Sequence, residues 1–101
     1  MQMKITRWDK PHKPDIEELK NILRQEGTHP FVWIDEPGTY YGNHSHTFDE
    51  VRWVVSGKMR YGVGEEEFVL GPGDRLDLPA GTVHWAKVEG NEPVIYLCAS
   101  K

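Results

Sequence analysis

The chain has 101 residues, with twelve basic and sixteen acidic side chains and a formal net charge of −4. This length fits one domain, and the acidic balance argues against a nucleic-acid-binding surface. No apolar run is long enough to span a membrane, and the first ten residues lack the apolar core of a secretory signal. The single cysteine, Cys98, excludes an internal disulfide framework. We therefore expect a cytoplasmic protein with no nucleic-acid or membrane partner.

Residues 1–28 are expected to form an N-terminal arm and one short helix. The arm includes a short strand near Lys4–Trp8. A helix is expected over Asp15–Glu26, because Asp15 and Glu18 have the spacing of a helix-capping pair and Gly27 ends the helix. Four apolar residues between them recur at helical spacing: Ile16, Leu19, Ile22 and Leu23. This stripe predicts a helix packed on the outside of a larger structure, with a lid over a binding site as the alternative.

Residues 29–101 alternate between short apolar segments and Gly- or Pro-containing turns, a pattern typical of antiparallel strands. The expected strands are Phe31–Asp35, Thr39–Tyr41, Val51–Ser56, Met59–Val63, Glu67–Leu70, Arg75–Leu78, His84–Val88 and Val94–Ala99. So many short strands need an architecture that hides their edges, such as a jelly roll or a closed barrel. We therefore predict an all-β protein, with a barrel over residues 29–101 and one domain overall.

The segment between two of these strands carries candidate metal ligands. His44 and His46 are one residue apart, and Glu50 follows four residues later. Alternate side chains of an extended backbone share a face, so the two imidazoles should point the same way. A further candidate, His84, follows the turn at residues 78–83. Imidazole nitrogens and a carboxylate that converge on one point suit a borderline divalent metal.

Two segments resemble the signatures of the cupin family. Residues Gly38 to Gly57 resemble the first signature, G(X)5HXH(X)3-4E(X)6G, at every fixed position. Residues Gly73 to Val88 resemble the second, G(X)5PXG(X)2H(X)3N, with Val88 in place of the final Asn. The stretch from His44 to Arg52 also resembles the metal-site segment of acireductone dioxygenases.

The cupin resemblance implies a double-stranded β-helix, or jelly-roll, barrel with a metal at its centre. It implies a ligand set of three histidines and one carboxylate: His44, His46, Glu50 and His84. One divalent transition-metal ion per chain is expected, with Fe, Mn, Ni, Zn and Cu all compatible with such ligands. One or two coordination positions would remain open for water, oxygen or substrate.

Strand alternation predicts the lining of a substrate pocket. If Glu50 faces inward, the side chains at positions 52, 54 and 56 also face inward. On the next strand either positions 58, 60 and 62 or the more apolar positions 59, 61 and 63 line the interior, and the apolar set is preferred. The predicted pocket residues are Arg52, Val54, Met59, Tyr61 and Val88. Cys98 is expected to be a small core residue, and no residue is assigned a catalytic role.

Arg52 has two interpretations in such a chamber. It forms an interior salt bridge, to Asp77 or Glu67, because a buried guanidinium without a partner is costly. Alternatively it clamps an anionic or enediolate substrate, because a guanidinium recognises paired oxygens.

On the outward face of the strand that carries Arg52, the apolar residues at 51, 53 and 55 need cover. The helix, the arm or a second copy could supply it, and we predict a homodimer that covers Val51, Trp53 and Val55.

Three classes of function fit these features. The leading hypothesis is a metal-dependent oxygenase that acts on a small organic substrate, because of the open metal positions and Arg52. The alternative is a non-catalytic metal-bound module that binds a small molecule or senses it, because 101 residues leave little chain for a lid. Metal-assisted isomerisation or hydrolysis ranks third, since Tyr61 is the only inward acid or base that the sequence suggests.

Overall fold

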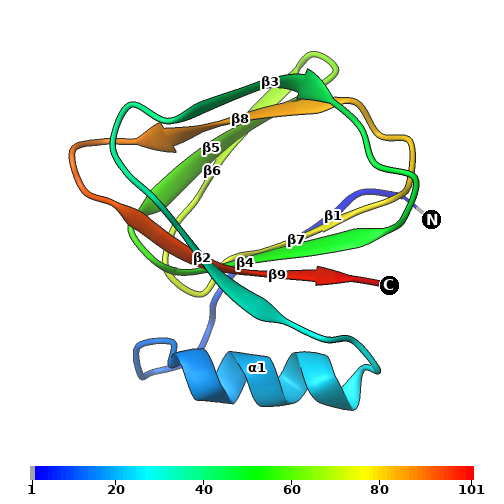
Figure 1. Cartoon of the computed structure of the whole chain (residues 1–101). Coiled ribbons are helices and arrows are strands. Elements are labelled where there is room, and N and C mark those ends of the chain that lie inside the picture. Colours follow the sequence, from blue (N-terminus) through cyan, green and yellow to red (C-terminus); the bar gives the residue numbers. More distant parts are fainter. Residues whose placement is uncertain (1) are drawn as a thin grey trace.

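Two antiparallel sheets face each other in the computed structural model, which describes residues 2–101 (Figure 1). The elements over these residues are β1 (Lys4–Thr6), α1 (Ile16–Gln25), β2 (Phe31–Asp35), β3 (Tyr40–His44), β4 (Glu50–Ser56), β5 (Lys58–Val63), β6 (Glu66–Leu70), β7 (Arg75–Leu78), β8 (His84–Glu89) and β9 (Val94–Ser100). Every predicted strand is present, with ends that differ by at most a few residues. The all-β prediction with one short N-terminal helix is confirmed.

The five-stranded sheet has the order β1-β7-β4-β9-β2, and the four-stranded sheet has the order β3-β8-β5-β6. A first core fills the space between them, with fully buried residues from both sheets, among them Val54, Met59, Leu70 and Leu76. The histidines lie at the end of the barrel interior that this core does not fill. The strand pairing therefore leaves a chamber between the sheets.

The helix covers the outer face of the five-stranded sheet (Figure 1). Asp15 caps it by accepting a hydrogen bond from the backbone N–H of Glu18 at 3.1 Å. Its apolar stripe forms a second core with residues of β4 and β9, including the fully buried Val51 and the 7% exposed Trp53. No helix in the described part of the chain is long and apolar enough to cross a bilayer.

This second core corrects one expectation. The outward stripe at positions 51, 53 and 55 packs against α1, and Trp8 of the arm also contacts this cluster. The buried Trp53 indole is satisfied within the chain, because its Nε1 donates to the carbonyl oxygen of Gly73 at 2.8 Å. The prediction that a second copy covers this stripe is therefore wrong, while the oligomeric state itself stays a prediction.

Two glycines of the paired signatures have a structural reason to be glycine. Gly57 and Gly73 both have positive φ values, +78° and +88°. A Cβ at Gly57 would lie 2.3 Å from the carbonyl oxygen of Pro93, and one at Gly73 would lie 2.2 Å from the Trp8 ring. A side chain would therefore be strained by the backbone conformation and would collide with a neighbour. The Gly57 turn takes the chain from the five-stranded sheet to the four-stranded one, and the Gly73 turn returns it to the five-stranded sheet.

Candidate functional site

Three histidines converge at one end of the chamber between the sheets. His44 is the last residue of β3 and His84 is the first of β8, and the two are directly paired across these strands. His46 follows in the loop before β4. One ring nitrogen of each residue lies within 4.8 Å of the others, so that all three can reach a single metal ion. The fold thus brings His84 next to His44 and His46, although His84 lies 40 residues after His44 in the sequence.

Backbone carbonyls orient two of the three rings. The Nδ1 atoms of His44 and His84 lie 2.6 Å from the carbonyl oxygen of Gly42 and 2.9 Å from that of Thr82. Because a carbonyl only accepts, each Nδ1 carries the proton and each Nε2 keeps its lone pair. Burial lowers the pKa of His84, which favours the neutral, ligating form of the ring. Hydrogen bonds of this kind fix the tautomer of metal-ligating histidines.

Glu50, at the start of β4, points its carboxylate toward the same place. Its Oε2 lies 3.4 Å from His46 Nε2, and its Oε1 lies 3.5 Å from His84 Nε2. Donors bound to one ion at about 2.0–2.2 Å lie about 3–3.4 Å apart. Two of these buried atoms, His46 Nε2 and Glu50 Oε1, have no hydrogen-bond partner within residues 2–101. A buried nitrogen or oxygen without a hydrogen-bond partner calls for an explanation. A metal ion bound between the histidine nitrogens and the Glu50 carboxylate would supply one, because the distances between these atoms are close to those between ligands of one ion.

Asp49 fastens together the two loops that carry the histidines. Its Oδ1 accepts a hydrogen bond from the backbone N–H of Ala80 at 2.7 Å. One residue further on, the N–H of Gly81 donates to the carbonyl oxygen of His46 at 2.8 Å. These two bonds tie the segment of His46 to the turn that precedes His84. Asp49 lies at a variable position of the first signature, so the sequence alone carries no signal for this role.

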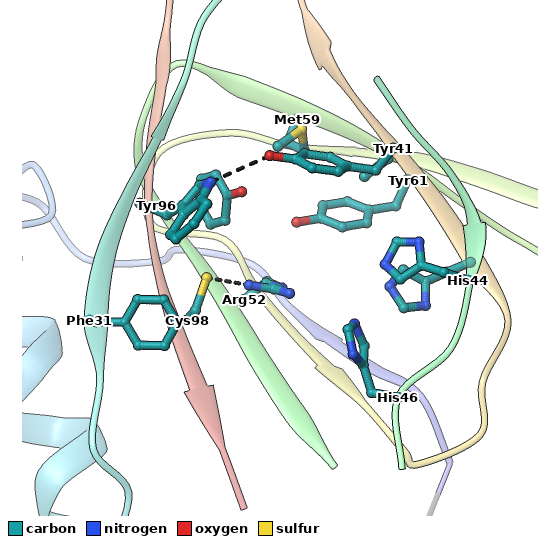
Figure 2. Close-up of a pocket in the computed structure, with 12 residues that line it drawn as sticks. Phe31, Tyr41, His44, His46, Arg52, Met59, Tyr61, Tyr96 and Cys98 are labelled. Atoms are coloured by element: carbon teal, nitrogen blue, oxygen red, sulfur yellow. Dashed lines mark hydrogen bonds between the residues drawn. The ribbon is translucent and has the colours of Figure 1, made fainter. Parts of the chain in front are cut away.

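A pocket of about 290 Å³ extends from the histidines into the barrel. Figure 2 shows the histidines at one end, Tyr96 and Phe31 at the other, and Arg52 and Tyr61 between them. Three of the predicted pocket residues line it: Arg52, Met59 and Tyr61. Val54 and Val88 do not, because they are buried in the core beyond its wall. Ala86, on the same face of β8 as His84, also lines it. The remaining lining, which the sequence did not indicate as pocket residues, consists of Phe31, Trp33, Tyr41, Tyr96 and Cys98.

Arg52 pairs with neither of the carboxylates that the sequence suggested. Its Nη2 lies 3.1 Å from Glu50 Oε2, its Nη1 donates to Cys98 Sγ, and its guanidinium lies over the Tyr96 ring. Asp77 instead pairs with Arg75, and Glu67 with Arg60. The predicted bridge to Asp77 or Glu67 is wrong, because both of those carboxylates have a nearer arginine.

Cys98 is buried at the pocket wall beside Arg52. Burial raises the pKa of its thiol to about 11, although the nearby guanidinium acts in the opposite direction. The thiol is therefore protonated at neutral pH, and a protonated thiol is a poor nucleophile. Cys98 serves as a small wall residue and an acceptor for Arg52.

These features define a double-sheet β-barrel with a three-histidine cluster that can hold a metal ion. The Cupin domain family matches residues 31–100, and the chain belongs to the cupin family. The matched region contains both signature segments, all three histidines and every strand from β2 to β9.

Two curated relatives are dioxygenases. The chain is 37% identical over 62 residues to gentisate 1,2-dioxygenase of a Ralstonia species. The aligned region covers 60% of this chain and 18% of the relative. It is 33% identical over 57 residues to acireductone dioxygenase of Exiguobacterium sibiricum. This aligned region covers 52% of this chain and 32% of the relative. The chain thus matches less than a third of the length of either enzyme.

Solved structures show the same fold. A cupin 2 domain-containing protein from Halorhodospira halophila aligns with a TM-score of 0.75 and 20% identity, over 100% of this chain and 76% of that one. A DMSP lyase, DddQ, from Ruegeria pomeroyi aligns with a TM-score of 0.66 and 25% identity, over 73% and 38%. An oxalate decarboxylase from Bacillus subtilis with Mn(II) centres aligns with a TM-score of 0.65 and 26% identity, over 73% and 21%. The double-stranded β-helix prediction is confirmed.

Proposed function

We propose that this chain is a metal-dependent oxygenase that acts on a small organic substrate. One divalent transition-metal ion would be held by four side chains: His44, His46, Glu50 and His84. The observation that carries the proposal is the set of converging ring nitrogens beside an unsatisfied buried Glu50 oxygen, at the end of a pocket. The similarity to two dioxygenases adds support for oxygen chemistry.

The ion would supply Lewis acidity and, if it is redox-active, oxygen activation. The chain's own residues would bind and orient the substrate. Arg52 lies between the histidines and the far end of the pocket, where its remaining N–H groups can hold anionic oxygens. Tyr61 points its hydroxyl into the pocket beside Arg52 (Figure 2). Burial raises the pKa of this hydroxyl, so that it stays protonated and donates a hydrogen bond. Met59 and Ala86 supply an apolar wall for the substrate.

The second candidate is a metal-bound module that binds a small molecule without turnover. Phe31 and Trp33, on the edge strand β2, line the pocket and are 49% and 45% exposed. Half-exposed lining residues leave the pocket open to solvent, whereas oxygenases benefit from closing the site around reactive species. This exposure favours a binding module.

The first test is metal content. Untagged protein should contain about one divalent ion per chain by elemental analysis, and His84→Ala should lose most of it, because a ligand is removed. The matched control is His12→Ala, since His12 is exposed and hydrogen-bonds Glu18 far from the site. Retention of the full metal content by His84→Ala would refute the assigned centre.

The second test separates oxygenase from binder. Oxygen uptake by the metal-loaded protein should be measured with panels of small diols, enediols and phenols. A substrate that consumes oxygen in the wild type, and not in His84→Ala, supports the oxygenase. Ligands that bind by calorimetry with no oxygen uptake across the panel support the binding module instead.

A further inference from the structure

A buried carboxylate lies behind the pocket wall, at the end away from the histidines. Asp35, the last residue of β2, is 6% exposed. Its Oδ1 accepts from the Tyr41 hydroxyl at 2.8 Å and from Trp33 Nε1 at 3.1 Å, and its Oδ2 accepts from the Tyr96 hydroxyl at 2.6 Å. No cationic side chain of residues 2–101 forms an ion pair with it. The negative charge is therefore stabilised by neutral donors alone, which is uncommon for a buried carboxylate.

The three donors around Asp35 all line the pocket. Because the hydroxyl protons of Tyr41 and Tyr96 are directed to the carboxylate, only oxygen lone pairs remain for a ligand, and Trp33 Nε1 lies 3.4 Å from the Tyr41 oxygen. Burial and Asp35 raise the pKa of both hydroxyls, so that both keep their protons at neutral pH. This end of the pocket thus offers acceptors, aromatic faces and a negative charge behind them.

The opposite character prevails nearer the histidines. There the Arg52 guanidinium supplies donors, and Figure 2 shows it between the histidines and Tyr96. The pocket therefore has a donor region beside the candidate metal centre and an acceptor region beside Asp35. Ligand groups of opposite charge match these two regions.

We propose that the Asp35 end of the pocket is a subsite for a positively charged group, and that the ligand is a small zwitterion. Its anionic group lies toward Arg52 and the histidines, and its ammonium or similar cationic group lies against Trp33 and Tyr41. The Tyr96 ring is already faced by the Arg52 guanidinium, whose central carbon lies 5.9 Å from the ring centre. A cation is attracted to aromatic faces and to the carboxylate behind them. The hydroxyl oxygens accept hydrogen bonds from its N–H groups. This inference rests on the proposed function only for the anchoring of the anionic group.

The competing explanation is structural. Tyr41 and Trp33 lie on β3 and β2, and Tyr96 lies on β9. The bonds from Trp33 and Tyr96 to Asp35 lie within the five-stranded sheet, and the bond from Tyr41 joins the two sheets. If that were the only role, changing the Asp35 charge would alter stability and leave the charge preference of ligands unaffected. The experiment must therefore compare ligands that differ only in the cationic group.

Calorimetric titration of the purified protein with matched probes makes this comparison. The pairs are γ-aminobutyrate against butyrate, ε-aminocaproate against caproate, and butylamine against butanol. At least one amino carboxylate should bind about tenfold more tightly than its unsubstituted partner, as expected for a cation against aromatic rings. Equal affinities within every pair would overturn the subsite.

Variants identify the group responsible. Asp35→Asn should abolish the preference for the amino probe, whereas Glu36→Gln should leave it unchanged, because Glu36 is the next residue and is exposed. Tyr41→Phe keeps the ring and removes one acceptor, so it should weaken the preference; it decides the question if Asp35→Asn does not fold. A preference that survives both pocket variants would refute the proposal. If no carboxylate binds at all, the anionic anchor of the proposed function fails, and butylamine against butanol then decides the subsite by itself.

Discussion

Replacing Arg52 by methionine should destabilise the metal-free protein much more than the metal-loaded one. Arg52 and Glu50 are 3.1 Å apart, with side chains 20% and 4% exposed. Removal of one partner of a buried pair costs about 3–5 kcal/mol, because the other charge is left uncompensated. Since Arg52 keeps some contact with solvent, we expect the lower end, about 3 kcal/mol. For a domain of this size that is a fall in Tm of about 12–24 °C.

A bound divalent ion would itself neutralise Glu50. The loss in the metal-loaded protein should therefore shrink to about 1 kcal/mol, a value typical of lost packing. Thermal denaturation followed by circular dichroism, with chelator and with excess zinc, measures both values. The control is Arg60→Met, because Arg60 pairs with Glu89 at 2.7 Å in a setting where both side chains are about a third exposed. Such a pair contributes about 0.2–1 kcal/mol with or without metal.

Two outcomes would refute this reasoning. If metal-free Arg52→Met melted like the Arg60→Met control, Arg52 would not be compensating a buried charge. If zinc failed to reduce the difference from wild type, Glu50 would not face the ion. The second outcome would remove Glu50 from the proposed ligand set while leaving the three histidines in place.

Three further predictions concern the supports of the site and the fold. Asp49→Ala should weaken metal affinity about 10- to 100-fold, as loss of an outer hydrogen bond does, because the turn at Ala80 is no longer tied to the segment of His46. Competition with a chromophoric chelator measures the affinity, and an unchanged value would contradict the prediction. The pKa of Glu26 is lowered from 4.5 by its hydrogen bonds to Arg75. This pair therefore stabilises the protein above pH 4.5, and its contribution is lost as the pH falls through the lowered pKa. Urea denaturation should show Glu26→Gln to be less stable than wild type at pH 7, with the difference vanishing in acid; a constant difference would refute the assignment. Trp53→Ala should cost about 3–5 kcal/mol in urea denaturation, and a loss below about 1 kcal/mol would show that the helix is only loosely docked.

The local elements could be predicted from the sequence because each depends on short-range pattern. The Asp15 cap and the apolar spacing of α1 predicted the helix to within a residue at each end. Gly and Pro between β-branched and aromatic runs predicted the strands. The inward set of β4 also followed from alternation, since Glu50 and Arg52 face the interior while Val51 faces the helix.

The partners of inward side chains could not be predicted in the same way. Arg52 was expected to pair with Asp77 or Glu67. The β4–β7 register instead places Asp77 opposite Val51 on the outer face, beside Arg75 of its own strand, and the β5–β6 register places Glu67 near Arg60. The bulge between Val54 and Ser56 in the β4–β9 pairing likewise has no clear signal in the sequence. Pairing partners depend on register across strands far apart in the chain, and alternation within one strand says nothing about it.

By itself, the sequence determined the class of fold and the residues offered as metal ligands, because both depend on spacing along one backbone. Only the tertiary structure decided what covers the outer stripe at Val51 and Trp53, since a helix, an arm and a second copy all satisfy the same apolar pattern. It also decided the far end of the pocket, where Asp35, Tyr41 and Tyr96 meet. The pairing of β2 with β9 brings Asp35 and Tyr96 together, and the closure of the four-stranded sheet over the five-stranded one adds Tyr41 of β3.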